Sequence, residues 1–410
     1  MESGGLHFTL LTHSSNMDMD SINGFFDQTL RYCTFSESEL EDCIDLYPKM
    51  SEFQGLLVKD IPIQYGVFRV DGTLFMVGGC RLEDDIIASE PTNWMWSVSP
   101  PPPHVASPNM CWTRCPTAMN VKRIISVLVP LRDGRIFICG GTADLESWAE
   151  IYDPAKGLFE ARKLSDDIGY PRPSSCFQWT DELVVIYYHC WVYSKELFYC
   201  PWYSGDLGED KQHTKPSLLS YNLRTKEWEV IEEKLPEPLP HSYNKMKRNL
   251  VYVGCDTLFI IDSTYNWFSY NLSSKEVGKV KFEVQSKEDV DEYDYIYELV
   301  VGAVYAGNNV SQSTGWVIYI FQLDMDMFET CLRYSKVEVV QCKGMDYVAT
   351  VLSSGLVTVG FFSDVDIIVD REIAKNEVKT NALAGKALLP KKRARESLLK
   401  EKGEEKIDDE

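Results

Sequence analysis

An internal repeat limits what this chain of 410 residues can fold into. Each copy has an aromatic residue, then Asp, Asn or Gln, and a large apolar residue seven positions after the aromatic. The copies are Tyr152 to Phe159, Tyr221 to Trp228, Tyr270 to Val277 and Phe321 to Phe328, with a weaker one at Tyr47 to Phe53 and with Trp112 matching only the second position. Without two apparent insertions, the copies recur about every 50 residues, a spacing typical of supersecondary units that bury their faces against neighbours.

A second element of the repeat is a turn followed by an apolar run that ends in glycine. It reads DGTLFMVGG over Asp71–Gly79, DGRIFICGG over Asp133–Gly141 and SGLVTVG over Ser354–Gly360. Asp-Gly between apolar runs predicts a β-hairpin. One unit then contains four expected strands, at Ile124–Pro130, Arg135–Gly141, Trp148–Tyr152 and Phe159–Lys163.

Four short strands at this period predict an all-β propeller, in which radially packed sheets cover each other's faces and leave only short edges. The markers indicate six blades, with strands near Tyr347–Gly360 and Ile44–Val58 closing the ring. Seven is the alternative, if Phe8–His13 and Thr29–Phe35 form an additional blade. The expected organisation is an N-terminal extension over 1–40 with strands that close the ring, a propeller over 41–372 and a charged, disordered or helical tail over 373–410.

The sequence resembles the kelch-repeat family most clearly over Asp71–Arg172. The residues that carry the resemblance are Gly78, Gly79, Trp112, Met119, Arg123, Gly140, Gly141, Tyr152, Asp153, Pro154 and Phe159. It weakens in the later units, where the double glycine is lost. The resemblance implies a propeller whose loops bind a partner protein. Many relatives carry an F-box or BTB domain, but residues 1–40 lack the leucine-proline pattern of the first and the length of the second.

Charge and cysteine usage indicate where such a chain works. The 62 acidic residues outnumber the 41 basic ones, and a net charge of −21 disfavours binding to nucleic acid or anionic membranes. We find neither a spanning apolar stretch nor a secretion signal, so we expect an intracellular, non-secreted protein of the nucleus or cytoplasm. The 12 Cys contain no CxxC pair, and apolar runs around residues such as Cys139 and Cys255 predict reduced core residues.

Three segments are candidates for a partner-binding face. The Pro-rich insertion Ser89–Pro108 and the aromatic insertion His189–Pro216 are both expected to follow the second strand of a blade, and the acidic segment Ser286–Tyr297 to follow a fourth strand. Loops at these places lie on one face of a propeller. The predicted contact residues are Trp191, Tyr193, Trp202 and Tyr203, because aromatic side chains dominate binding hot spots. Packing of these rings on their own blade is the alternative, and the acidic segment would attract a basic partner or simply be solvated.

The sequence lacks the motifs of propeller enzymes and other common catalytic sites. The six His form no ligand-like pair, and the residues Arg123-Ile124-Ile125 lack the aromatic ligand of glyoxal-oxidase-like chains. The Glu-x3-Asp-x3-His iron motif of plant specifier proteins, sialidase Asp boxes, GxSxG, P-loop and HExxH motifs are absent too. We therefore expect no enzyme activity, no metal site and no cofactor. A galactose-oxidase-like propeller enzyme, with a metal site that the sequence does not reveal, is the alternative.

The tail differs from the rest of the chain because it contains no aromatic residues after Ala374. A basic run there matches a short nuclear-import signal, and its residues are Lys391, Lys392, Arg393 and Arg395. A solvated charge run is the alternative. Together these features predict a non-enzymatic, monomeric module that docks a partner protein, as a substrate receptor or scaffold. A structural role within a larger complex is a third hypothesis.

Overall fold

The structure is a computed structural model of the chain, and its compact unit runs from Gly5 to Val369. The described residues are 7–17, 26–41, 51–52, 65–70, 73–82, 89–99, 112–124, 126–165, 168, 171–190, 216–232, 235, 249–261, 267–283, 299–308, 315–325, 330–360 and 364–369. Over these ranges the fold is all-β, apart from the short helix α1 (Glu37–Glu41) and the 3-10 turn η3 (Leu145–Ser147). None of the described helices is long and apolar enough to cross a membrane.

Four sheets have four strands each, with a separate ribbon of β6 (Cys80–Leu82) and β7 (Ser89–Pro91). The first sheet along the chain contains β4 (Gly66–Val70), β5 (Thr73–Val77), β8 (Met95–Val98) and β9 (Thr113–Arg114). The next contains β10 (Val127–Pro130), β11 (Ile136–Cys139), β12 (Ala149–Asp153) and β13 (Leu158–Arg162). The third contains β14 (Pro171–Gln178), β15 (Leu183–Cys190), β16 (Pro216–Asn222) and β17 (Trp228–Glu232). The fourth joins β26 (Asp364–Val369) to β1 (His7–Met17), β2 (Phe26–Ser36) and β3 (Ser51–Glu52).

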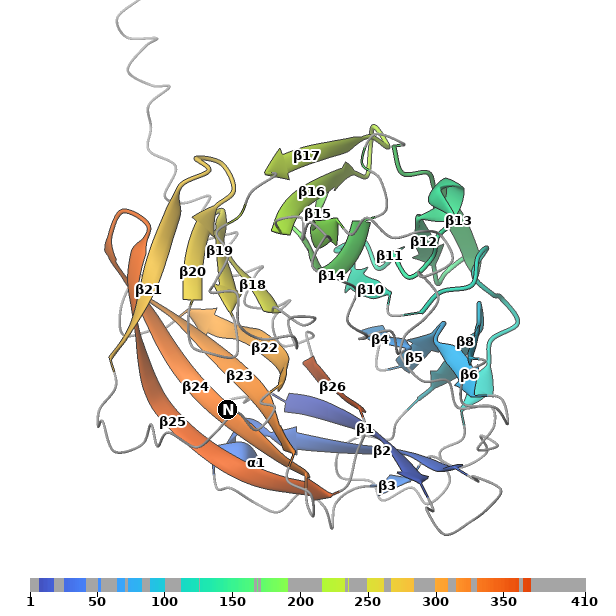
Figure 1. Cartoon of the computed structure of the whole chain (residues 1–410), viewed down its shortest axis with the longest axis horizontal. Helices are drawn as coiled ribbons and strands as arrows, with labels where there is room; N and C mark the ends of the chain where they lie inside the picture. Colours follow the sequence, from blue (N-terminus) through green and yellow to red (C-terminus); the bar gives the residue numbers. More distant parts are fainter. Residues whose placement is uncertain are drawn as a thin grey trace, which may run out of the picture. The chain divides into compact units, whose positions relative to one another are not determined.

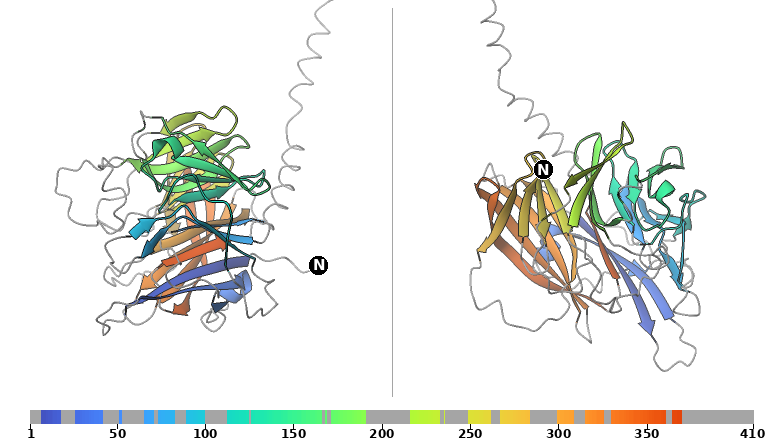
Figure 2. Two further views of the ribbon diagram at one scale, coloured as in Figure 1. Left: turned by 90° about the vertical axis from the view of Figure 1, so that its right-hand side faces the viewer. Right: turned by 45° about the horizontal axis from the view of Figure 1, so that its top comes forward.

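A larger sheet of eight strands consists of two further units of four. The first unit is β18 (Asn249–Gly254), β19 (Thr257–Ile261), β20 (Trp267–Asn271) and β21 (Val277–Glu283). The second is β22 (Leu299–Asn308), β23 (Gly315–Met325), β24 (Thr330–Lys343) and β25 (Asp346–Gly360). Their outer strands β21 and β25 pair in parallel and so join the two neighbouring units into one continuous sheet (Figure 2).

Contacts between the first strands of the units make the arrangement a propeller. β4 contacts β10, β10 contacts β14, β14 contacts β18, β18 contacts β22, β22 contacts β26, and β26 contacts β4 again. Figure 1 shows these strands on the inner side of their sheets, around a common centre. The described strands thus group as six four-stranded units in cyclic order.

One sheet combines strands from distant parts of the sequence, and it meets the expectation only in part. β1, β2 and β3 come from the expected extension over 1–40 and the expected segment Ile44–Val58, but the C-terminal strand is another one. β26 pairs with β1, so Phe8 lies opposite Val369 and Leu10 opposite Ile367. The expected segment Tyr347–Gly360 instead belongs to β25, the fourth strand of its own unit. The segments considered for a seventh blade do form strands, β1 and β2, but they lie in this closing sheet.

The repeat has a simple physical basis in the hairpin between the third and fourth strands. Asp153, Asn222 and Asn271 each accept two backbone N–H bonds through the side-chain oxygen, at 2.7–3.3 Å. Four positions later the backbone is left-handed, with φ of 61° at Gly157, 65° at Lys226 and 60° at Lys275. This turn fixes the strand pairing and brings the repeated aromatic and apolar positions opposite each other, as between Tyr152 and Phe159.

Two predicted copies of the repeat are wrong. Phe321 lies inside β23, the second strand of its unit, where it pairs with Tyr334. Gln322 follows it, and a glutamine side chain is too long to form the turn that Asp and Asn make with their own backbone. The run Ser354–Gly360 was expected to form a turn followed by a second strand. It instead continues β25, the fourth strand of its unit.

The double glycines pack against the segments that join neighbouring sheets. Gly78 and Gly140 both have a left-handed backbone, with φ of 65° and 73°. A methyl group at Gly78 would lie 2.7 Å from the Arg123 carbonyl oxygen, and one at Gly140 would overlap the Pro173 side chain. Glycine is needed at these positions both for its conformation and for its small size.

Second strands are more buried than the outer, fourth strand of a unit. All described residues of β11 and β19 are buried, whereas the outer strand β13 is largely exposed. The predicted core cysteine Cys139 is fully buried, but the same prediction for Cys255 is wrong because this residue is exposed. The apolar run ends at Gly254, and the following turn holds Cys255 and Asp256 at φ of 49° and 60°.

Candidate functional site

The aromatic insertion is anchored by a regular pair of strands. Its predicted contact residues Trp191, Tyr193, Trp202 and Tyr203 lie outside the described residues. The insertion leaves β15 and returns at β16, where His189 lies opposite Pro216 and Tyr188 opposite Ser217. Tyr188 is buried, so a packed base holds both ends of residues 191–215 at adjacent positions. The insertion therefore follows the second strand of its sheet, as the sequence predicted.

The predicted location of the Pro-rich insertion is wrong. Ser89–Pro108 contains β7 and the third strand β8, whose residues Met95 and Val98 are buried. The extra chain after the second strand is instead the β6–β7 ribbon, with Cys80 opposite Pro91. The proline run, from residue 100 on, follows the third strand and lies outside the described residues. Tryptophans on either side of Met95 supply a short strand signal that the neighbouring prolines obscured.

The acidic segment Ser286–Tyr297 also lies outside the described residues. It follows β21, the fourth strand of its unit, and precedes β22, so its place in the chain order matches the prediction. The basic run Lys391–Arg395 in the tail lies outside the described residues as well. Where these segments point stays a prediction.

On the opposite side of the sheets, several described polar groups in the short hairpins between first and second strands are paired with one another. Arg132 forms an ion pair with Asp181 of the next sheet, with 2.7 Å between Nη1 and Oδ1. Trp179 donates an indole N–H to Asp256 of the following sheet at 2.8 Å. These contacts connect consecutive units and use the polar atoms that a partner would otherwise contact.

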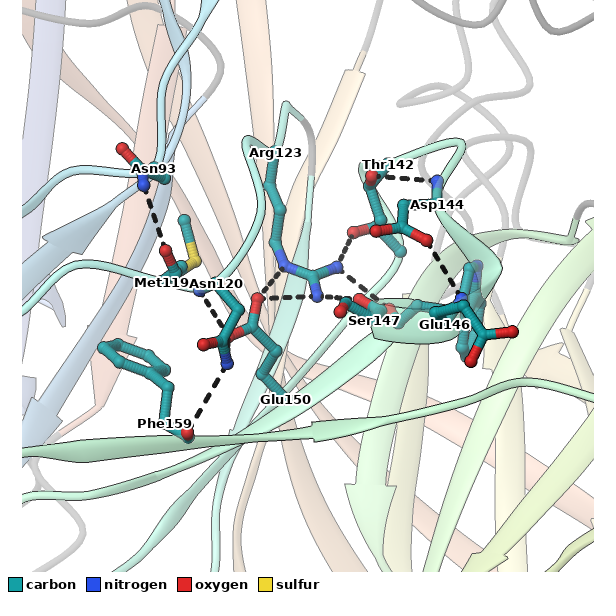
Figure 3. A network of polar contacts seen from close by, with 12 residues as sticks. Asn93, Met119, Asn120, Arg123, Thr142, Asp144, Glu146, Ser147, Glu150 and Phe159 are labelled. Atoms are coloured by element: carbon teal, nitrogen blue, oxygen red, sulfur yellow. Dashed lines mark hydrogen bonds and ion pairs between the residues drawn. The ribbon is translucent and has the colours of Figure 1, made fainter.

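Figure 3 shows a buried polar network around Arg123. Arg123 precedes β10, Glu150 lies on β12, and both side chains are fully buried. The guanidinium Nε and Nη2 donate to Glu150 Oε1 at 3.2 and 2.9 Å. Nη1 donates to the carbonyl oxygens of Gly140 and Trp148 at 2.5 and 2.9 Å, and Nη2 also donates to that of Ser147.

The remaining oxygen of Glu150 is equally well used. Oε2 accepts from the backbone N–H and the side-chain amide of Asn120, both at 2.8 Å. Burial lowers the pKa of Arg123, while the charge of Glu150 and the hydrogen bonds to it act in the opposite direction. All five guanidinium N–H groups and both carboxylate oxygens are occupied, so the pair has no capacity left for a substrate. Its role is to hold the segment before β10 against β11 and β12.

Arg123 also connects two sheets through its backbone. Its N–H donates to the Thr92 carbonyl at 2.9 Å, and its carbonyl accepts from Gly79 N–H at 2.8 Å. Sequence reasoning identified Arg123 and both glycine pairs as parts of the repeat but missed Glu150. The available signal was a single charged side chain within the apolar run of β12, at a position where its neighbours Ala149 and Ile151 are buried.

Over the ranges that the structure describes, His, Cys, Asp and Glu nowhere gather in a group of three or more that could hold a metal ion.

Comparisons with known proteins place the chain in no family. No family model matches it, and no curated protein sequence matches it either. A GH74 xyloglucanase from Xanthomonas campestris is similar in structure, with a TM-score of 0.40 and 10% identity over 84% of this chain and 45% of that one. So is a complex of KlAtg21 with the coiled coil of AgAtg16, with a TM-score of 0.33 and 10% identity over 84% of this chain and 99% of that one.

A puromycin-hydrolysing peptidase of Mycobacterium tuberculosis has a TM-score of 0.24 and 12% identity over 57% of this chain and 29% of that one. This chain therefore spans less than half the length of the xyloglucanase and of the peptidase. All three TM-scores lie below 0.5.

Proposed function

We propose that this protein is a degenerate kelch-type propeller that docks a partner protein, without enzyme activity, through the aromatic insertion between β15 and β16. The observation that carries the proposal is the paired and buried base of that insertion. His189 and Pro216 lie opposite each other, so the aromatic-rich residues 191–215 are presented from a fixed position. A fixed spacing of the two ends lowers the entropy cost of binding, and aromatic side chains supply large contact areas.

The opposite side of the sheets supports this choice of face. There, hairpins between first and second strands make contacts between units, such as Arg132 with Asp181 and Trp179 with Asp256. The acidic segment Ser286–Tyr297 connects the fourth strand of one unit to the first strand of the next. In a propeller, such connections lie on the same face as those between second and third strands, where the insertion begins. A partner with a basic segment therefore suits this face best, and the role is that of a substrate receptor or scaffold.

The kelch assignment is supported by the same details that build the repeat. The glycine pairs contact the joining segments, and the Asx turns place aromatic residues opposite each other, as between Tyr221 and Trp228. These are the positions at which the sequence resembles kelch repeats.

Affinity capture of the full-length protein tests the docking proposal. The probe variant changes Trp191, Tyr193, Trp202 and Tyr203 to Ala, and bound proteins are identified by mass spectrometry. The matched control is Leu158→Ala, which truncates a side chain that is 58% exposed on a hairpin of the other face. We expect a partner that the wild type and the control hold and the probe variant loses, while circular dichroism is unchanged. Equal retention by all three proteins would contradict docking through the insertion.

We also propose that the tail directs the protein to the nucleus through Lys391, Lys392, Arg393 and Arg395. Extended basic side chains suit the acidic sites of an import carrier. Imaging of the chain with and without Lys391–Arg395 tests this, because deletion should shift the protein to the cytoplasm. An unchanged nuclear signal would reject the import role.

A further inference from the structure

The outer edge of the first sheet along the chain is open at one residue. β9 is the last strand in the order β4-β5-β8-β9, and its Arg114 lies opposite Trp96 of β8. The next residue, Cys115, donates its backbone N–H to the Met95 carbonyl oxygen at 2.8 Å. Hydrogen-bonded and non-hydrogen-bonded pairs alternate along an antiparallel ladder, so the backbone N–H and C=O of Arg114 point away from β8. Among the residues that the structure describes, neither group has a hydrogen-bond partner.

The corresponding outer strands of the following units are engaged by their neighbours. The carbonyl oxygen of Lys163, directly after β13, accepts the indole N–H of Trp228 from the next sheet at 2.6 Å. The carbonyl oxygen of Ile231 on β17 accepts from the ammonium group of Lys275 at 3.0 Å, and β21 is paired with β25. An unpaired strand edge is a template for a further strand, and these contacts occupy part of that edge in three units. The edge of β9 stays open at Arg114.

The side chain of Arg114 is held in place by an aromatic ring. Its guanidinium lies over the indole of Trp94, 4.2 Å from the ring centre, and Trp96 meets the same indole edge to face at 6.3 Å. Arg114 is exposed, while both tryptophans are partly buried. Over the described ranges, the N–H groups of this guanidinium form no hydrogen bond and no ion pair. The indole therefore fixes the plane of the cation and leaves its donors available.

Arg114 differs in this respect from other arginines of the described surface. Arg132, Arg135 and Arg224 each form an ion pair with a carboxylate of this chain, at 2.7–3.1 Å. Carboxylates are abundant, because the chain has 62 acidic residues for 41 basic ones. An arginine that stacks on tryptophan instead is preorganised for a carboxylate of another molecule, since a guanidinium binds a carboxylate through two parallel hydrogen bonds.

We propose that the edge of β9 at Arg114 binds an extended acidic segment of a partner protein by strand addition. The backbone of the segment pairs with the N–H and C=O of Arg114, and an Asp or Glu side chain on the same face accepts from the guanidinium. One residue supplies only one pair of backbone hydrogen bonds, so the side-chain contact determines which segment binds. The site belongs to another sheet than the aromatic insertion and does not depend on docking there.

Selection of a random heptapeptide phage library on the full-length protein tests the proposal. We expect the wild type to enrich peptides with Asp or Glu at a fixed position. A synthetic peptide from this set should bind about tenfold more weakly to Arg114→Gln. Arg114→Lys should be weakened too, because it keeps the charge but loses the planar fork. The matched control is Arg224→Gln, whose native side chain is 73% exposed, and it should bind like the wild type.

Backbone pairing is tested with the same peptide. A methyl group on the peptide nitrogen that faces Arg114 should abolish binding, and one on the next nitrogen, which faces away from β9, should not. The variant with the four aromatic residues of the insertion changed to Ala should bind this peptide normally. Circular dichroism checks that each variant is folded. No enrichment of acidic peptides, equal binding by Arg114→Gln and the wild type, equal effects of the two methyl groups, or loss of the peptide by the insertion variant would overturn the proposal.

Discussion

Replacement of Glu150 by Gln should strongly destabilise the protein without changing the shape of the side chain. In the native protein each carboxylate oxygen accepts two hydrogen bonds: Oε1 from Arg123 and Oε2 from Asn120. The amide removes the negative charge and puts an NH2 group opposite one of these sets of donors. Arg123 is then a fully buried cation without a counter-ion, a situation that costs about 3–5 kcal/mol. That is a large part of the about 5–15 kcal/mol that usually stabilises a domain.

The measurement is urea unfolding followed by tryptophan fluorescence and by circular dichroism, with Glu146→Gln as the matched control. Glu146 pairs with Lys163, and the two side chains are 70% and 50% exposed. Exposed pairs contribute about 0–1 kcal/mol, so the control should unfold almost like the wild type. A loss at Glu150 of under about 1 kcal/mol, no larger than that of the control, would refute the assignment of this pair as a structural link.

A double-mutant cycle separates the pair from general packing damage. Arg123→Met leaves the Glu150 carboxylate buried without its cation, and the combination with Glu150→Gln removes both charges. The double mutant should therefore lose clearly less than the sum of the two single losses. Additive losses would mean that each side chain acts independently of the other.

Three further predictions concern turns and one tyrosine. Lys226→Gly should stabilise the protein by about 0.5–1 kcal/mol, because φ is 65° at this exposed residue. Thr225→Gly in the same turn should destabilise it. Urea midpoints measure both effects, and a shift of the two midpoints in the same direction would contradict the argument from backbone strain. Gly140→Ala should cost about 1–3 kcal/mol and more than Gly134→Ala, since a methyl group meets the next sheet at Gly140 and open space at Gly134. Burial raises the pKa of Tyr270 to about 12, with Glu232 adding to the effect. The folded state thus holds this proton more tightly, and the resulting stability is present below about pH 10 and lost as the pH rises toward 12. Tyr270→Phe should remove one late step from the ultraviolet titration of tyrosinate, and an unchanged curve would refute the shift.

The sequence was sufficient for the propeller because the fold-determining signals are local. A short Asx side chain and a left-handed position build one hairpin, and the strands of the unit from β10 to β13 lie within a few residues of the predicted ranges. The same logic explains the failure at Phe321, where the following Gln322 cannot make the turn. The long strands β24 and β25 and the parallel pairing of β21 with β25 depend on contacts between distant segments, which no short pattern records.

Less of the candidate site could be predicted. The aromatic insertion was located correctly because β15 is a long apolar run and β16 begins with a proline. The Arg123 network was not, since a buried Glu150 resembles an ordinary alternating position until the fold of the segment before β10 is known. The structural role of Glu150 depends on its partner Arg123, which is 27 residues away in sequence.

The closing sheet has a consequence for the order of events during synthesis. β1 and β2 leave the ribosome early, but β1 finds its second partner only when Asp364–Val369 has been made. At about 5–20 residues per second the delay is roughly 20–70 seconds. Over that interval one edge of β1 is open to other strands. It is the edge that later pairs with β26, where Leu10 lies opposite Ile367. Cells that make this protein therefore need to protect that edge, and strains with less holding chaperone should accumulate aggregates of nascent chains more than of the finished protein.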